Sequence, residues 1–145
     1  TALGTDNVAN NNSYDLFNEM QTTAKLMALR ERQPNAVPAR QILEMATSGG
    51  ARALGLDDRI GSLEANKLAD LISLDLAEIG WVPRSTQDLY TALVHAINGS
   101  YVRDVMVDGR WLLRDGAWTT LDYSSDCARL EKACTELLSR RAGAA

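Results

Sequence analysis

Apolar side chains in the first third of the chain recur at helical spacing after a short extended stretch. Residues 1–5 are small, β-branched or apolar, which predicts the end of a buried strand, and the Asn-rich run over 7–12 predicts the loop that follows it. A helix is then expected over 14–32, with Asn12 or Ser13 as its N-cap. The apolar stripe of this helix consists of Leu16, Phe17, Met20, Ala24 and Met27.

A second helical segment follows a break at 33–35. Pro38 predicts its first turn, and Gly49-Gly50 predicts an interruption. Residues 51–54 then predict one further turn, which Gly55 can end in the left-handed conformation. These glycines serve turns and packing, because no Walker A loop or strand-preceded dinucleotide fingerprint surrounds them.

The pattern changes to β-structure near the middle of the chain. A strand is predicted over 69–74, with Leu71, Ile72 and Leu74 buried. Residues 65–67 are expected to form a tight connection before it.

Turn signals organise the carboxyl-terminal half. Ser85 with Asp88 predicts the start of a helix, and Asp108-Gly109 between two apolar runs predicts a β-hairpin with a primed turn. Asp115-Gly116 predicts the next turn, and a final helix is expected over 122–140. The inward-facing side chains of that helix are expected to be Leu130, Ala133, Cys134, Leu137 and Leu138.

Composition narrows the class of protein. The chain has 145 residues, and 46% of them are hydrophobic, which is enough for one modest soluble domain. Fifteen Lys and Arg against nineteen Asp and Glu give a net charge of -4 without a basic cluster, so nucleic acid is not expected as a partner. No apolar run approaches the roughly 20 residues that span a bilayer, and no signal pattern opens the chain. A cytoplasmic protein without a membrane partner is therefore expected.

Several chemically suggestive residues have structural explanations. Lys67 and Asp70 are expected to form a surface ion pair rather than a catalytic pair. Cys127 and Cys134 lie seven residues apart in a helical pattern, about 10 Å along the axis, so they are expected to be free thiols. His95 lies near a predicted helix end and is expected to pack or cap there.

The chain cannot build a His-rich metal site of its own. A catalytic zinc or iron site takes about three His or carboxylate ligands plus an open position, and this sequence has one histidine. The sequence also begins without Met, inside what resembles a strand whose neighbours are absent. We therefore expect the chain to be the carboxyl-terminal portion of a longer polypeptide.

Asp6 is the main candidate for chemistry. It follows the predicted strand directly, and active sites of parallel α/β folds lie at the carboxyl ends of strands. A carboxylate there can serve as metal ligand, general base or substrate anchor. The alternative is that Asp6 only caps the loop by accepting backbone N–H groups.

The residues around Asp6 resemble a known family. Gly4-Thr5-Asp6, Asn11-Asn12-Ser13, Asp15-Leu16-Phe17 and Glu19-Met20 are similar to the last barrel strand and following helix of the metal-dependent amidohydrolase superfamily. The resemblance is to the aminohydrolase branch, which includes adenosine and S-adenosylhomocysteine deaminases, guanine deaminases and triazine hydrolases. Three later segments agree in order and spacing: Met45 to Leu56, Ile60 to Ile72, and Val105 to Arg110. Asn66 stands where the family usually has Gly, so the resemblance implies a positive φ there, which Asn tolerates better than most residues.

The resemblance implies an α/β fold of two parts. Residues 1–58 would form the last strand and closing helices of a (β/α)8 TIM barrel, and 59–121 the carboxyl-terminal part of a small composite β-sandwich with flanking helices. Residues 122–145 would form a terminal helix and tail. The missing amino-terminal barrel portion would be the partner of this chain, and a homo-oligomer is expected.

The resemblance also implies a hydrolase that acts on C–N bonds of a small nitrogen heterocycle, by hydrolytic deamination of an aminated purine, pterin or similar ring. One divalent metal, zinc or alternatively iron, is the implied cofactor, with Asp6 as a metal ligand and catalytic proton carrier. Asn11 and Asn12 correspond to the family's loop at the pocket mouth, where each amide either contacts substrate or shapes the turn.

Two alternatives stay open at this stage. The chain could be a non-catalytic interaction or assembly module whose exposed edges recruit a partner by strand addition. It could also belong to a triazine-type dechlorinase or alkylamine hydrolase, because the pocket walls that select the leaving group are expected on earlier loops.

Overall fold

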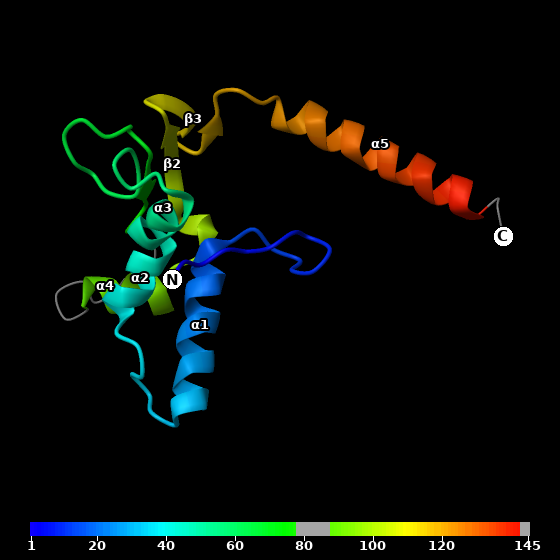
Figure 1. Cartoon of the computed structure of the whole chain (residues 1–145). Coiled ribbons are helices and arrows are strands. Elements are labelled where there is room, and N and C mark those ends of the chain that lie inside the picture. Colours follow the sequence, from blue (N-terminus) through cyan, green and yellow to red (C-terminus); the bar gives the residue numbers. More distant parts are fainter. Residues whose placement is uncertain (78–87, 143–145) are drawn as a thin grey trace.

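The computed structural model describes residues 1–77 and 88–142 as five helices and four strands with one 3-10 turn (Figure 1). The helices are α1 (Leu16–Glu31), α2 (Ala39–Ala46), α3 (Ser48–Leu54), α4 (Leu89–His95) and α5 (Tyr123–Ala142), and the 3-10 turn is Gly99–Tyr101. The strands are β1 (Leu71–Leu74), β2 (Val102–Val107), β3 (Arg110–Arg114) and β4 (Ala117–Trp118). Ser85, which was expected to begin α4, lies outside the described residues.

Helix α1 begins later than the sequence pattern predicted. Asp15 is its N-cap, because its carboxylate Oδ1 accepts the backbone N–H of Phe17 at 2.9 Å. Ser13 Oγ accepts the N–H of Asp15 at 3.0 Å, so Ser13 supports the cap instead of forming it. The prediction of Asn12 or Ser13 as N-cap was therefore wrong, since the longer Asp side chain reaches the first free N–H groups of the helix.

The break between α2 and α3 falls at Thr47 and not at the two glycines. Gly49 lies inside α3, where a Cβ would come within 2.7 Å of the Thr1 carbonyl oxygen and 2.8 Å of the Glu44 carbonyl oxygen. Only glycine permits that approach, which brings the start of the chain against the α2–α3 junction. Gly55 ends α3 with φ +69°, as the sequence predicted.

The core lies where α1, α2 and α4 meet. Met20, Ile42 and Val94 form one buried cluster, and Phe17 packs against it and against a second cluster that contains Ala92 and Ile97. The core is small for the length of the chain. The solvent-accessible surface is 10612 Å², whereas a compact monomer of 15.8 kDa exposes roughly 7,300 Å².

Residues 1–5 are extended but form no strand within the described part of the chain. Their link to the rest of the fold includes the hydrogen bond from the Leu3 N–H to the Met45 carbonyl oxygen, at 3.1 Å. A strand requires a neighbour to accept its ladder of hydrogen bonds, and no described segment supplies one. The predicted strand is thus absent, although the segment leads into the loop as expected.

The four strands form one antiparallel sheet in the order β1-β2-β3-β4. Asp108 and Gly109 have φ +50° and +72°, which confirms the predicted primed hairpin turn between β2 and β3. Asn66 has φ +72°, also as predicted. The prediction of a buried Ile72 was wrong, because Ile72 is 48% exposed and β1 is an edge strand of the described sheet.

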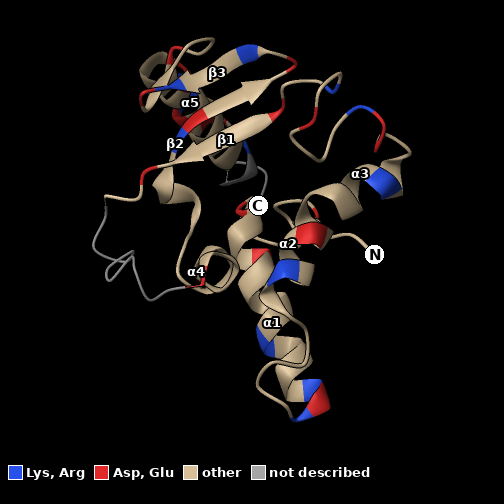
Figure 2. Ribbon diagram, turned by 90° about the vertical axis from the view of Figure 1, so that its left-hand side faces the viewer, with Lys and Arg blue, Asp and Glu red and all other residues tan. Residues whose placement is uncertain are grey.

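A hollow separates the sheet from the helices. Figure 2 shows the sheet on one side of α1, α2 and α4, and shows acidic and basic residues interspersed along the ribbon. The hollow has a volume of about 500 Å³, and its lining is mainly apolar. Helices and sheet contribute Phe17, Met20, Leu43, Leu71 and Met106 to it.

Helix α5 extends away from the remainder of the described chain (Figure 1). The prediction that its apolar stripe faces inward was wrong: Leu130, Leu137 and Leu138 are 65%, 64% and 66% exposed. A helical stripe is buried only when a second surface lies against it, and none does so within the described residues. Local sequence fixes the helix, whereas its burial depends on more distant structure.

Gly61→Ala is expected to destabilise the protein by roughly 1–3 kcal/mol. Gly61 has φ +91°, and a Cβ there would lie 2.6 Å from the Cβ of the buried Ala51. The matched control is Gly50→Ala, where the helix leaves open space for a methyl group and Ala favours the helix by about 1 kcal/mol. Thermal unfolding of both variants tests this, and an unchanged midpoint for Gly61→Ala would contradict it.

Candidate functional site

Asp6 lies exposed at the first bend after the extended segment. Its backbone adopts the left-handed conformation with φ +57°, which Asp tolerates better than most residues. The Oδ1 atom accepts the N–H of Asn7 at 2.7 Å, and Oδ2 accepts the side-chain amide of Asn10 at 3.3 Å. Asp6 therefore combines the loop-capping role with a carboxylate that solvent can reach.

Asn7 organises the loop behind Asp6. Its side-chain Oδ1 accepts the N–H groups of Ala9 at 2.9 Å and Asn10 at 3.2 Å. Its carbonyl oxygen accepts the N–H groups of Asn10 and Asn11, at 3.1 and 2.9 Å. The run of Asn residues thus forms one tight turn, as expected for side chains that bond their own backbone.

Asn11 and Asn12, which the sequence placed together at the pocket mouth, have different surroundings. Asn11 is half-buried, and its Nδ2 donates to the Thr5 carbonyl oxygen at 3.0 Å and to Glu19 Oε1 at 2.6 Å. Asn12 is exposed. Sequence reasoning assigned no role to Glu19, although an acidic residue in the first turn of the next helix lies within reach of such a loop.

Asp15 makes a second contact that the sequence did not reveal. Besides capping α1, its Oδ2 accepts the N–H of Gly99 at 2.9 Å, which joins the start of α1 to the 3-10 turn before β2. Gly99 leaves room for this approach, since a Cβ there would lie 3.3 Å from the same oxygen. The loop that carries Asp6 is thus attached to the fold at its far end.

Asp6 can serve as a metal ligand only together with ligands from outside the described residues. Carboxylate oxygen is a ligand that zinc and iron accept, and Asp6 presents one to solvent. Within residues 1–77 and 88–142, no three His, Cys, Asp or Glu side chains come together in a way that could hold a metal ion. His95 is exposed in the last turn of α4.

Lys67 and Asp70 do not form the predicted ion pair. Lys67 Nζ donates to the Asp57 carbonyl oxygen at 2.6 Å and to Ser62 Oγ at 2.7 Å. Asp70 Oδ1 instead accepts the N–H of Asp108 at the hairpin turn, at 2.7 Å. The prediction was wrong because the carboxylate beside Lys67 Nζ is that of Glu64, at 3.7 Å, whereas the Asp70 carboxylate satisfies a backbone N–H of the hairpin.

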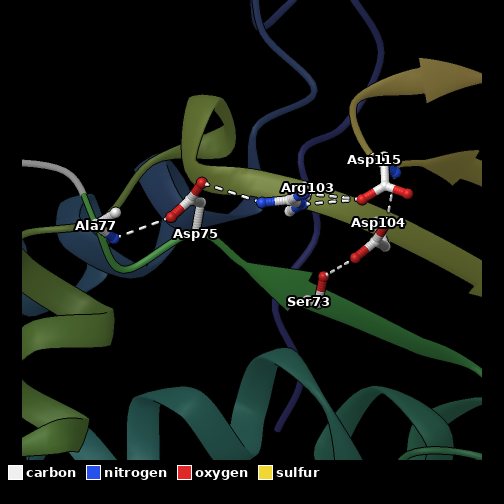
Figure 3. Close-up of polar contacts among 6 residues, drawn as sticks. All are labelled: Ser73, Asp75, Ala77, Arg103, Asp104 and Asp115. Carbon is white, nitrogen blue, oxygen red and sulfur yellow. Dashed lines mark hydrogen bonds and ion pairs between the residues drawn. The ribbon is translucent and has the colours of Figure 1, made fainter.

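A second polar cluster lies on the sheet (Figure 3). Arg103 donates to Asp115 at 2.8 Å and lies 3.6 Å from Asp75. Asp104 faces Ser73 across β1 and β2, accepts its hydroxyl, and also accepts the N–H of Asp115 at 2.7 Å. These contacts join three segments of the sheet and explain the cluster as structural.

Asp104→Asn is expected to flatten the acid limb of the stability curve. The Ser73 hydroxyl and the Asp115 N–H hold the pKa of Asp104 below its ordinary value. A lowered folded-state pKa contributes stability above the unfolded pKa of about 4, and this contribution is lost as the pH falls through the folded pKa. Wild type and variant should therefore differ at pH 7 and converge in acid.

Thermal midpoints measured between pH 7 and pH 2 check this expectation. Asp58→Asn, which removes an exposed carboxylate elsewhere, is the control and should run parallel to wild type. A constant difference between Asp104→Asn and wild type across the series would contradict it.

The two cysteines are free thiols, as predicted, and both lie on α5. Cys127 is half-buried and Cys134 is exposed. Among the helices that the structure describes, none is both long enough and apolar enough to cross a membrane.

The sequences of proteins named as deaminases align with most of this chain. A 5-methylthioadenosine/S-adenosylhomocysteine deaminase of Syntrophobacter fumaroxidans is 45% identical over 129 residues, which is 89% of this chain and 29% of that protein. A 5'-deoxyadenosine deaminase of Methanosarcina mazei is 41% identical over 139 residues, 96% of this chain and 31% of that protein. The chain thus spans about 30% of the length of the curated relatives it matches.

Solved structures match the fold. An adenosine deaminase from Xanthomonas campestris with bound zinc superposes with a TM-score of 0.89 at 34% identity, over 95% of this chain and 31% of that chain. A mutant atrazine chlorohydrolase of Arthrobacter aurescens, complexed with zinc and atraton, superposes with a TM-score of 0.72 at 27% identity, over 85% of this chain and 27% of that chain. This mixed α/β chain therefore matches part of the amidohydrolase structures.

The family model described as Amidohydrolase family matches residues 1–112, which include the Asp6 loop, all of the core helices and the sheet as far as β3. That match covers well over half of the chain. The resemblance first seen around Asp6 is thereby confirmed, and the chain belongs to the amidohydrolase family.

Proposed function

We propose that this chain is the carboxyl-terminal part of a metal-dependent hydrolase that deaminates adenosine-type nucleosides. The observation that carries the proposal is the exposed Asp6 carboxylate on its ordered loop, within a chain that is more than 40% identical to two adenosine-analogue deaminases over most of its length. In the complete enzyme, residues 1–58 would close a barrel and 59–121 would complete a β-sandwich. In such an enzyme, the rest of the protein would cover the apolar hollow and the excess exposed surface that this chain has.

Asp6 would act as one metal ligand and as the proton carrier. When bound, a divalent metal such as zinc or iron lowers the pKa of water toward about 7, which supplies a nucleophile at neutral pH. Asp6 would accept the proton of the attacking water and pass it to the departing amino group, so that a C–O bond forms, the C–N bond breaks and ammonia leaves. The N–H of Asn7 holds one carboxylate oxygen and leaves the other in a weaker contact, 3.3 Å from Asn10.

The remaining ligands and the walls of the pocket would come from sequence beyond these 145 residues. Asn12 is the better candidate for a substrate contact, because it is exposed whereas the amide of Asn11 is engaged within the loop. The proposed substrate is a small molecule, and neither nucleic acid nor membrane has a part in it.

The decisive experiment is an assay of the full-length protein with added zinc. Deamination of adenosine, 5'-deoxyadenosine, 5'-methylthioadenosine and S-adenosylhomocysteine is followed by ammonia release and by the absorbance change of the purine ring. Guanine, aminated pterins and chlorinated or alkylamino triazines test the other leaving groups and rings. Turnover of an adenosine compound above all others supports the proposal.

Two results would redirect it. Preference for a triazine would favour the dechlorinase or alkylamine hydrolase. The 27% identity to an atrazine chlorohydrolase is the reason for including triazines in the assay. No turnover of any compound, with zinc absent from the purified full-length protein, would favour the assembly module. The surface of 10612 Å² is the observation that favours this second candidate.

A further inference from the structure

We infer that Asn11 and Glu19 are a positioning pair that holds the peptide between Thr5 and Asp6 and thereby fixes the direction of the Asp6 carboxylate. The catalytic consequence of this inference rests on the function proposed above, whereas the structural consequence does not. The pair is recognised by two hydrogen bonds from one amide nitrogen, Asn11 Nδ2, to the Thr5 carbonyl oxygen at 3.0 Å and to Glu19 Oε1 at 2.6 Å.

The first bond acts on Asp6 through the planarity of the peptide. The carbonyl of Thr5 and the N–H of Asp6 belong to the same rigid unit, which has no free rotation about its C–N bond. Fixing the Thr5 oxygen therefore fixes the plane from which the Asp6 backbone departs. The carboxylate follows, because its Oδ1 is bonded at 2.7 Å to the next N–H along the chain.

The Asp6 conformation requires such support. A non-glycine residue at φ +57° is less favourable than one in the common regions and persists when neighbouring contacts hold it. Asn7 bonds the chain after Asp6, and Asn11 bonds the chain before it. The left-handed residue is thus held on both sides.

Glu19 gives the pair a rigid base. It lies in the first turn of α1 and precedes Met20, which is buried in the core against α2 and α4. A carboxylate acceptor makes the 2.6 Å contact a charge-assisted bond, stronger than one between neutral groups. The core of the fold is thereby connected to Asp6 through α1, Glu19, Asn11 and the Thr5 carbonyl in turn.

The same geometry argues against Asn11 Nδ2 as a hydrogen-bond donor to substrate. An amide nitrogen carries two hydrogens, and both have an acceptor here. Donation to a substrate acceptor would leave the Thr5 carbonyl or the half-buried Glu19 carboxylate without its donor, which is unfavourable. Through these two donor bonds Asn11 acts on the reaction by way of Asp6.

The test compares Asn11→Ala, Glu19→Ala and Glu19→Gln in the full-length, zinc-loaded protein. Asn11→Ala and Glu19→Ala are expected to lower kcat by roughly tenfold to a hundredfold, as displacement of a reacting group does, while KM changes little. Glu19→Gln keeps an amide oxygen that can accept the same bond, so it should restore most of kcat. The matched control is Glu31→Ala on the same helix, whose carboxylate pairs with the adjacent exposed Arg30 and should leave kcat unchanged.

A crystal structure of full-length Asn11→Ala provides a readout that does not depend on activity. We expect Asp6 to leave the left-handed conformation or its carboxylate to move by about 1 Å, with the core helices unchanged. An unmoved Asp6 together with unchanged kcat overturns the inference, and so does a raised KM at constant kcat, which would make Asn11 a substrate contact. If the wild type has no deaminase activity, the proposed function fails while the crystal structure still decides whether the pair positions Asp6.

Discussion

Asp6→Asn in the full-length protein is expected to lower kcat by roughly 10²–10⁴-fold while leaving the fold intact, because an amide cannot accept and return the proton in the catalytic cycle. The substitution keeps the size of the side chain. Its carbonyl oxygen can still accept the N–H of Asn7, which the carboxylate does now at 2.7 Å. Asn also tolerates the left-handed conformation that Asp6 adopts at φ +57°.

Kinetics and thermal unfolding of the same preparation check this expectation. The thermal midpoint should stay within about 2 °C of wild type, as for an exposed substitution that removes no packing. Asp58→Asn, another exposed carboxylate, is the control and should keep full activity. Retention of more than about a tenth of wild-type kcat would contradict the assignment of Asp6, since general acid–base groups contribute far more than that.

Local chemistry explains what could be predicted of the fold. The turn at Asp108-Gly109 and the left-handed Gly55 each depend on a residue and its immediate neighbours, and both are present in the structure. The same holds for α1, whose apolar stripe identified the helix although its N-cap is Asp15. Features of this kind require no knowledge of the rest of the protein.

The predictions that failed concern contacts between distant segments. The stripe of α5 is exposed, residues 1–5 lack a strand partner, and Ile72 lies on an edge strand. Each prediction was made from a pattern that indicates a side to be buried but does not identify the surface that buries it. A chain that spans about 30% of its relatives does not by itself provide all of those surfaces.

The candidate site divides in the same way. Asp6 could be proposed from its position after an extended segment and from the family resemblance. The contact of Glu19 with Asn11 could not be predicted, because only the folded loop brings these residues, eight apart in sequence, to 2.6 Å. Lys67 and Asp70 were predicted to pair because of their opposite charges. In the structure Lys67 donates to a backbone carbonyl oxygen and Asp70 accepts a backbone N–H.

Ile42→Ala is expected to have the largest effect on stability, a loss of roughly 2–5 kcal/mol, since removing a buried branched side chain leaves a cavity. Ile42 has no exposed surface and contacts Met20 and Val94, so it links α1, α2 and α4. Glu44→Ala on the same helix is the control, because its carboxylate is half-exposed and pairs with the exposed Arg40.

Ile42→Ala and Asp6→Asn are compared in the full-length protein by thermal unfolding and by kinetics at low temperature. The comparison separates effects on stability from effects on catalysis. Ile42 lies in the core and Asp6 lies exposed on the loop, so Ile42→Ala should lower the midpoint and preserve kcat well below it. Asp6→Asn should show the opposite pattern. A midpoint unchanged by Ile42→Ala would mean that this three-helix core does not limit stability. Loss of kcat in the folded Ile42→Ala protein would instead mean that core packing reaches Asp6 through Met20, Glu19 and Asn11, as the positioning pair permits.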